Sequence, residues 1–105
     1  MIVPAAELKR FVKEVFAQAK VPDEQAAMVA DCLVSANLSG VDSHGVVRLA
    51  HYIRRLENGS IKSRPEVTFE QTAPAIGIVD GDDGLGHVAM VHACKHAMTL
   101  AEASG

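Results

Sequence analysis

The sequence predicts an α+β fold that is mostly helical, with about four helices and a two-strand β segment between the third and fourth helices. Apolar residues recur every three or four positions in four stretches, which is the period of an amphipathic helix. Between the third and fourth stretches the period shortens to two, which indicates strands. At 105 residues the chain is one domain at most, or part of one.

The first two helices are predicted from their apolar stripes and from the residues that flank them. Residues 5–19 form the first helix, whose stripe consists of Leu8, Phe11, Val12, Val15, Phe16 and Ala19. Pro22 suits the start of the second helix, because its backbone angle is already compatible with a first helical turn. Gly40 is well placed to end this helix. Its apolar face is expected to carry Ala27, Ala30, Leu33, Val34 and Leu38.

A third helix is predicted from Ser43 to about Asn58. Ser43 is a good N-cap, and Gly59 follows the expected end of the helix. The apolar stripe consists of Val46, Leu49, Ile53 and Leu56. Because residues four apart lie on one face of a helix, His44 and Arg48 are expected to point the same way.

Two strands are expected after the third helix. Val67, Phe69 and Gln71 alternate with polar neighbours, and residues 75–79 form a short apolar run. Residues 72–74 are the expected connection, although they do not form a strong hairpin turn. Two strands are not an independent sheet. We therefore expect this chain either to oligomerise or to be part of a longer polypeptide.

The fourth helix is predicted to begin at His87, after the turn-forming residues 80–86. Gly105 stands where a cap at the end of the helix would be. The apolar positions step by three or four and suit a buried face, which would consist of Val88, Val91, Cys94, Met98 and Ala101.

The composition excludes several classes of function. The chain is 49% hydrophobic and 22% charged, with a formal net charge of −3, so it carries no electrostatic signature of nucleic-acid binding. It has no basic helix for a membrane surface and no apolar run of transmembrane length, and the first residues are not expected to act as a signal peptide. The two cysteines do not make a disulfide framework. A reducing, cytoplasmic setting is the simplest expectation.

The residues around His44 suggest a small carboxylate substrate. An imidazole can give or take a proton near neutral pH, and the guanidinium of Arg48 can hold a carboxylate through two parallel hydrogen bonds. Taken alone, each has a more ordinary role, as a surface or packing histidine and as a solvated helix arginine. Ser43 is most simply an N-cap. Tyr52, one turn further along the same face, either borders the pocket or packs at the edge of the core.

A glycine cluster precedes the last predicted helix. Gly81, Gly84 and Gly86 follow a strand, which is the right context for phosphate binding. Their spacing differs from the dinucleotide fingerprint, and Asp82 and Asp83 would repel a pyrophosphate. We therefore expect a turn and a helix start rather than a phosphate site.

Histidines in the last helix raise the question of a metal. His92 and His96 are four apart, but Cys94 between them points to another side of the helix, and His87 would join them only loosely. We expect no metal site. Cys32 is most simply a small core residue.

The segment Ala36-Asn37-Leu38-Ser39-Gly40-Val41-Asp42-Ser43-His44-Gly45-Val46-Val47-Arg48-Leu49 resembles the type-2 malate/L-lactate dehydrogenase family, which includes ureidoglycolate dehydrogenase and diketogulonate reductase. The resemblance continues through Tyr52, Arg55, Leu56, Gly59, Ile61, residues 79–81 and residues 84–86.

The resemblance implies an enzyme with a larger, non-Rossmann, NAD(P)-dependent dehydrogenase fold that acts as a homodimer. Residues 1–105 would be its N-terminal helical portion plus the start of the sheet domain, and the site for NAD or NADP would lie mostly outside this chain. By the same resemblance, His44 transfers the proton to the carbonyl or imine being reduced, Arg48 holds the substrate carboxylate, and Ser43 belongs to the same pocket. No metal would be needed.

Two functions follow as hypotheses. The first is an oxidoreductase that interconverts a 2-hydroxy acid and a 2-oxo acid of the malate, lactate or ureidoglycolate kind, with a nicotinamide supplying the hydride. The alternative is a non-catalytic helical module for interaction or dimerisation. The Asp-Ser-His-Gly segment favours the first hypothesis. The lack of a nucleotide-binding fingerprint favours the second for this chain alone.

Overall fold

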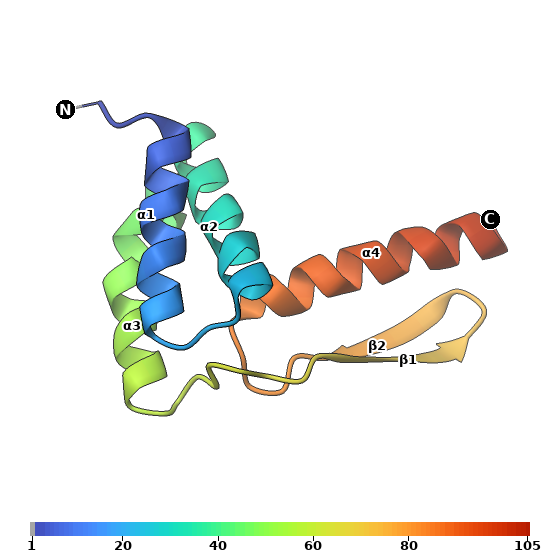
Figure 1. Ribbon diagram of the computed structural model, residues 1–105. Helices are drawn as coiled ribbons and strands as arrows, with labels where there is room; N and C mark the ends of the chain where they lie inside the picture. The colour runs from blue at the N-terminus through green and yellow to red at the C-terminus, as the bar shows by residue number, and fades with distance from the viewer. Residues whose placement is uncertain (1) are drawn as a thin grey trace.

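The computed structural model describes residues 2–105, which form four α-helices and one β-hairpin (Figure 1). The predicted α+β class, with the two strands between the third and fourth helices, is confirmed. In chain order the elements are α1 (Ala5–Gln18), α2 (Asp23–Leu38), the 3-10 turns η1 (Asp42–His44) and η2 (Val46–Arg48), α3 (Leu49–Glu57), β1 (Thr68–Ala73), β2 (Ile76–Asp80) and α4 (Gly86–Ser104).

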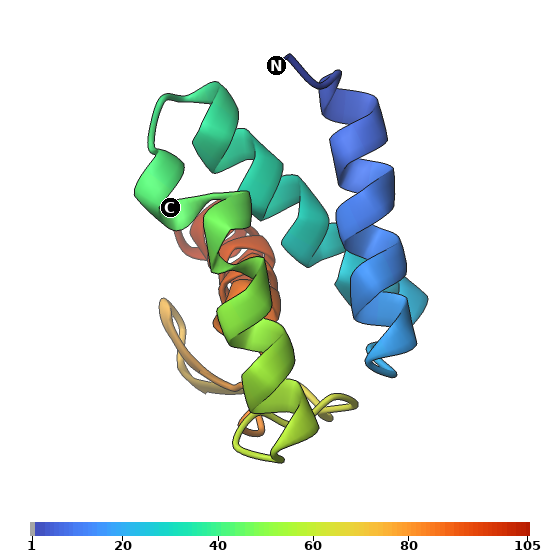
Figure 2. The same ribbon diagram turned by 90° about the vertical axis from the view of Figure 1, so that its left-hand side faces the viewer.

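The core lies where α1, α2 and α3 meet, and Figure 2 shows these three helices from the side, with α4 seen along its axis behind them. The largest fully buried side chains of α1 and α2 are Val12, Phe16, Val29, Leu33 and Val34. Two residues of the predicted stripes lie outside this core, since Phe11 is 53% exposed and Leu38 is 70% exposed. These two helices therefore follow the predicted period, but their stripes are narrower than predicted.

Gly40 ends α2 as predicted. Its φ of +77° is in the left-handed region, which glycine adopts at little cost. The N–H of Gly40 donates to the carbonyl of Asn37, and the N–H of Val41 donates to that of Ala36. This pair of bonds is a Schellman motif, which satisfies the last carbonyls of the helix and turns the chain sharply. The motif directs the chain into residues 42–48.

The prediction of one continuous helix from Ser43 was wrong. Residues 42–48 form η1 and η2, and the α-helical part begins only at Leu49. Gly45 between the two turns is extended, with φ −96° and ψ −148°, and the side-chain Oδ1 of Asn37 accepts the N–H of Val46 at 2.9 Å. Because α2 supplies this partner, Val46 has no need of an intrahelical one. Ser43 therefore caps no helix.

The two strands pair antiparallel, with Thr68 opposite Asp80 and Gln71 opposite Gly77. The expected connection at residues 72–74 was placed too early, because β1 continues to Ala73 and the turn is Pro74-Ala75. Thr72 helps to close this end, since its Oγ1 donates to the carbonyl of Ile76 at 3.5 Å. The pairing register of the two strands shifts between Gln71 and Ala73, next to this turn. The weak turn signal in the sequence is consistent with this irregular end of the hairpin.

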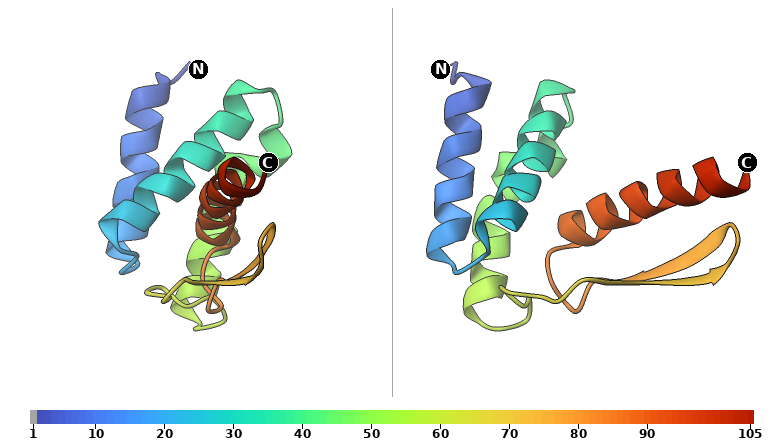
Figure 3. Two further views of the ribbon diagram at one scale, coloured as in Figure 1. Left: turned by 90° about the vertical axis from the view of Figure 1, so that its right-hand side faces the viewer. Right: turned by 45° about the vertical axis from the view of Figure 1, so that its right-hand side comes forward.

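The hairpin and α4 run side by side away from the three-helix core (Figures 1 and 3). The Cα radius of gyration is 15.1 Å and the extents are 48 × 30 × 21 Å, whereas a compact domain of this length has a radius of about 13 Å. The ring of Phe69 on β1 stacks on His96 of α4, with centroids 3.9 Å apart. The two strands thus find one partner, α4, within the described residues.

The predicted buried face of α4 is largely exposed. Val88 is the one fully buried residue of this helix, whereas Met98 is 60% exposed and Cys94 and Ala101 are also exposed. The helical period of the stripe was right, but the prediction that the stripe is covered was wrong for residues 2–105. The reason is geometric, because α4 leaves the core after its first turns (Figure 3).

The turn before α4 is tied to the segment that follows α3. One carboxylate oxygen of Asp82 accepts both the Lys62 ammonium at 2.9 Å and the backbone N–H of Glu66 at 2.8 Å. The N–H of Lys62 also donates to the carbonyl of Asp83.

In residues 2–105 no helix is long and apolar enough to cross a membrane.

Candidate active site

Three of the predicted site residues come together in the loop between α2 and α3. The hydroxyl of Ser43 lies 2.9 Å from Nδ1 of His44, and the guanidinium Nε of Arg48 donates to the carbonyl oxygen of Ser43 at 2.8 Å. His44 and Arg48 are therefore brought together through Ser43, and not by sharing the face of one regular helix as predicted. All three side chains are exposed.

The guanidinium of Arg48 is oriented but keeps its charge uncompensated. Only Nε is bonded to Ser43, and among residues 2–105 no carboxylate lies within 4 Å of this side chain. A guanidinium presents five N–H donors in a rigid plane, so the terminal nitrogens can bind a carboxylate in a bidentate fashion. The cluster thus offers a directed cation beside a proton-transfer group.

The imidazole of His44 is held through its Nδ1. The hydroxyl of Ser43 can donate to that nitrogen or accept from it, according to the tautomer. If the hydroxyl donates, Nε2 carries the ring's proton and faces away from Ser43. Such an arrangement suits general acid–base chemistry, which requires a defined tautomer within reach of the substrate.

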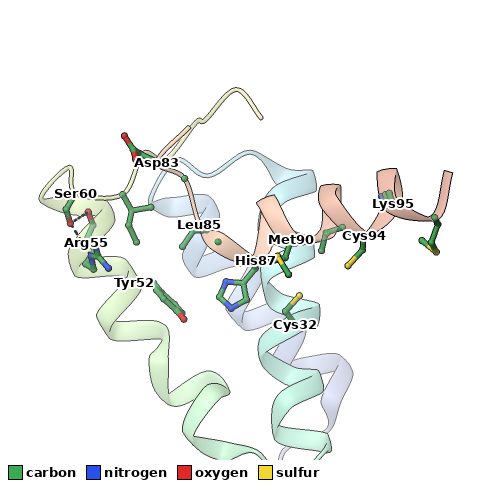
Figure 4. Close-up of a pocket in the computed structure, with 15 residues that line it drawn as sticks. Cys32, Tyr52, Arg55, Ser60, Asp83, Leu85, His87, Met90, Cys94 and Lys95 are labelled. Carbon is green, nitrogen blue, oxygen red and sulfur yellow. Dashed lines mark hydrogen bonds between the residues drawn. The ribbon is translucent and has the colours of Figure 1, made fainter. Parts of the chain in front are cut away.

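Tyr52 borders a groove between α3 and α4, as Figure 4 shows. The groove has a volume of about 960 Å³ and is mostly apolar, with Cys32, Leu85, Met90, Val91 and Met98 among its lining residues. The Tyr52 side chain is half-buried and meets the ring of His87 edge to face, with centroids 5.4 Å apart. Tyr52 is one helical turn beyond Arg48, and the groove that it lines includes none of Ser43, His44 and Arg48.

The position of His87 in this groove was not predicted from the sequence. Its Nδ1 is buried and has no hydrogen-bond partner in the described part of the chain. Burial lowers the pKa of this imidazole below its ordinary value, because desolvation penalises the charged form. From the sequence, His87 was considered only as a possible distant partner of His92 and His96 in a metal site. No local signal would have revealed its burial, since the contact with Tyr52 is made across the fold.

The other candidates have structural roles. No group of three His, Cys, Asp or Glu residues within residues 2–105 is close enough to hold a metal ion. His96 stacks on Phe69. Cys32 is half-buried in the groove wall rather than in the core, and burial, followed by the charge of Asp31, raises the pKa of its thiol. A raised pKa disfavours the reactive thiolate.

The glycine cluster forms a turn and a helix start, as expected. Gly84 packs so closely on Pro65 that a Cβ would overlap the proline ring. Asp82 and Asp83 both adopt left-handed backbone conformations in this turn, with φ of 53° and 56°. The Asp82 carboxylate is occupied by Lys62 and the Glu66 N–H, and the spacing of the glycines differs from the dinucleotide fingerprint.

Comparison with known proteins gives a consistent result along the whole chain. The model of the malate/L-lactate dehydrogenase family matches residues 3–105. Malate dehydrogenase of Pyrococcus horikoshii is 38% identical over 103 residues, which are 98% of this chain and 29% of the relative. Ureidoglycolate dehydrogenase (NAD(+)) of Escherichia coli strain K12 is 33% identical over 105 residues, which are 100% of this chain and 30% of the relative.

Solved structures agree with these matches. The sulfolactate dehydrogenase of Methanocaldococcus jannaschii superimposes with a TM-score of 0.94 at 35% identity, and the match covers 100% of this chain and 30% of that protein. The resemblance found in the sequence is therefore confirmed. The chain spans about 30% of the length of these relatives.

Proposed function

The chain belongs to the malate/L-lactate dehydrogenase family, and on this premise we propose that it is part of an NAD(P)-dependent dehydrogenase that interconverts a small 2-hydroxy acid and the corresponding 2-oxo acid. The observation that carries the proposal is the cluster of Ser43, His44 and Arg48, in which Ser43 contacts both of the other side chains. The three relatives named above act, by their names, on malate, ureidoglycolate and sulfolactate.

In this proposal His44 moves the proton and Arg48 binds the substrate. Reduction of a carbonyl builds negative charge on its oxygen, and His44 gives a proton to that oxygen or takes it back in the reverse direction. The guanidinium of Arg48 holds the carboxylate next to the carbonyl, which fixes the reacting carbon in place. Ser43 orients the imidazole. Tyr52 is proposed to border the substrate pocket from α3, next to the groove that it lines with His87.

The cofactor is proposed to be NAD or NADP, bound mostly by residues outside this chain. One relative's name specifies NAD(+), whereas the acidic turn at Asp82 and Asp83 is unsuited to a pyrophosphate. The nicotinamide supplies the hydride. We also propose a reducing, cytoplasmic setting, in keeping with two free cysteines.

Kinetics of two variants test the proposal in the full-length dehydrogenase. His44→Ala should lower kcat by about 10²–10⁴-fold, since that is the usual contribution of a general acid or base. Arg48→Ala should mainly raise KM for 2-oxo acids. Arg54→Ala, which changes an exposed arginine of the following helix α3, is the matched control and should leave both constants unchanged. The roles are wrong if Arg48→Ala affects carboxylate and non-carboxylate substrates equally.

The alternative is an interaction or dimerisation module without catalysis. Exposed apolar side chains on the hairpin and α4 favour an interaction surface, namely Ile76, Ile78, Met90 and Met98. The two proposals are compatible if the enzyme is a homodimer. The module alone predicts a stable dimer that oxidises no 2-hydroxy acid with NAD or NADP, and both properties are measurable on the same purified sample by light scattering and by absorbance of the reduced cofactor.

A further inference from the structure

We propose that Asn37 is a positioning residue of the active site: its side-chain amide holds the loop that presents Ser43, His44 and Arg48. The inference rests on the roles proposed above for His44 and Arg48. Asn37 itself touches neither of these side chains through any bond in residues 2–105. It acts on them through the backbone of the loop.

Both ends of the Asn37 amide are bonded to the loop. Its Nδ2 donates to a carboxylate oxygen of Asp42 at 2.8 Å, and its Oδ1 accepts the backbone N–H of Val46 at 2.9 Å. Asp42 precedes Ser43, and Val46 follows Gly45. The two bonds therefore lie on either side of residues 43–45, which include Ser43 and His44. They also lie at the junction where η1 ends and η2 begins.

Gly45 allows the amide to come so close. Its backbone is buried, and a Cβ at this position would overlap the side-chain amide of Asn37. The φ of Gly45 is −96°, which other residues also adopt. Space, and not backbone conformation, is thus the reason for a glycine at this position, and the space is filled by Asn37.

Asn37 belongs to a rigid element. It lies in the last turn of α2, where the fully buried Leu33 and Val34 hold the helix in the core. Its own carbonyl accepts the N–H of Gly40 in the Schellman motif. A side chain anchored in this way can transmit the position of α2 to the loop, whereas the exposed side chains of Ser43, His44 and Arg48 have no such anchor of their own.

A displaced loop would impair both proposed functions together. Ser43 contacts His44 through its hydroxyl and Arg48 through its carbonyl oxygen. If the Asn37 bonds are lost, Ser43 moves, and both the imidazole and the guanidinium move with it. The expected signature is a lower kcat combined with a higher KM for the carboxylate substrate. A general loss of folded enzyme would lower the apparent kcat and leave KM unchanged.

The first test is Asn37→Ala in the full-length dehydrogenase. We expect kcat/KM for a 2-oxo acid to fall by about 10–100-fold, because small misplacements of catalytic groups cost up to about 10²-fold. We also expect the amide hydrogen of Val46 to exchange faster with solvent. Asn58→Ala is the matched control, since Asn58 also accepts a backbone N–H through its Oδ1, from Ser60 at the far end of α3. This control should leave kcat, KM and the exchange of Val46 unchanged.

A charge swap keeps the test decisive if the alanine variant folds poorly. Asn37→Asp retains an acceptor for Val46 but sets two carboxylates against each other, so activity should fall. In the double variant Asn37→Asp/Asp42→Asn, the amide at position 42 donates to the carboxylate at position 37, which still accepts the N–H of Val46. Activity should therefore recover at least tenfold over the single variant. Absence of this recovery, or an unchanged KM in Asn37→Ala, would overturn the positioning role.

Failure of this inference is distinguishable from failure of the proposed function. If His44→Ala and Arg48→Ala leave kcat and KM unchanged, the proposed roles are wrong. If those two variants behave as expected and the Asn37 variants do not, the loop holds its position without the amide and only the positioning role is wrong.

Discussion

Arg48 shows how an exposed side chain can still have a defined direction. Its Nε is bonded to the carbonyl of Ser43, and no carboxylate in residues 2–105 neutralises it. An exposed ion pair would contribute only about 0–1 kcal/mol to stability, so little stability is lost by leaving this charge available. The same charge, aimed by one hydrogen bond, is what a carboxylate substrate requires.

At the same scale, His87 should make stability depend on pH. Burial lowers the pKa of its imidazole below the ordinary 6.5, so the unfolded chain takes up a proton more readily than the folded one. Stability is therefore complete above pH 6.5 and is progressively lost as the pH falls from there towards the lowered pKa. We expect the melting temperature to drop between pH 7 and pH 5.

The variant His87→Phe should reduce this drop, because it keeps an aromatic ring against Tyr52 and cannot be protonated. His51→Phe is the control, since His51 also contacts Tyr52 but is exposed. Thermal unfolding followed by circular dichroism at several pH values measures the effect. A drop of equal size in wild type and His87→Phe would show that other groups cause it.

At the scale of elements, the turn before α4 depends on a close approach between Gly84 and Pro65. A Cβ on Gly84 would overlap the buried, rigid ring of Pro65, whereas a Cβ on Gly86 would meet nothing within 4 Å. We expect Gly84→Ala to lower the free energy of unfolding by about 1–3 kcal/mol, as overpacking does. Gly86→Ala should be neutral or slightly stabilising. Urea unfolding of both variants measures the difference, and equal effects would contradict it.

The helix α2 offers a matched pair of leucines. Leu33 is fully buried and Leu38 is 70% exposed. Leu33→Ala should lower the free energy of unfolding by about 2–5 kcal/mol, because it removes buried apolar area and leaves a cavity. Leu38→Ala should change it by less than about 0.5 kcal/mol. If Leu38→Ala is as harmful as Leu33→Ala in the full-length protein, Leu38 is covered there by residues outside this chain.

The same scale explains which elements were predictable. Helices α1 and α2 satisfy their own backbone groups, so period and flanking residues predicted them. Residues 42–48 do not, because the N–H of Val46 is bonded to Asn37 of a neighbouring helix. Ser43 is a residue type that often caps helices, yet its hydroxyl is hydrogen-bonded to the imidazole of His44. Local propensity was overridden there by a contact between elements.

At the scale of the whole molecule, the chain is elongated and leaves apolar surface uncovered. The hairpin and α4 extend from the core (Figure 1), and their exposed residues include Ile76, Ile78, Met90 and Met98. An isolated two-strand hairpin is at best marginally stable, and here the hairpin packs on α4. The buried residues Leu85 and Val88 join α4 to the three-helix core.

The isolated chain is expected to lack most of the cofactor site. Titration of the 105-residue chain with NADH and NADPH should reveal no appreciable binding, because the residues proposed to bind the cofactor lie mostly outside this chain. Fluorescence of the reduced nicotinamide measures the binding, and the full-length dehydrogenase is the positive control. Tight binding by the isolated chain would mean that the cofactor site lies within these residues.

The sequence by itself determined the helical periods, the glycines that end α2 and α3, and the order of the elements, because each of these depends on neighbours along the chain. It also marked Ser43, His44 and Arg48 as candidate site residues by their chemistry. Only the tertiary structure decided that Ser43 joins His44 to Arg48, that Asn37 is bonded to their loop, and that half-buried His87 packs against Tyr52. The physical reason is the same in each case. A side chain's hydrogen-bond partner and its exposure to water are set by residues from other elements, and the order of residues along the chain does not specify those contacts.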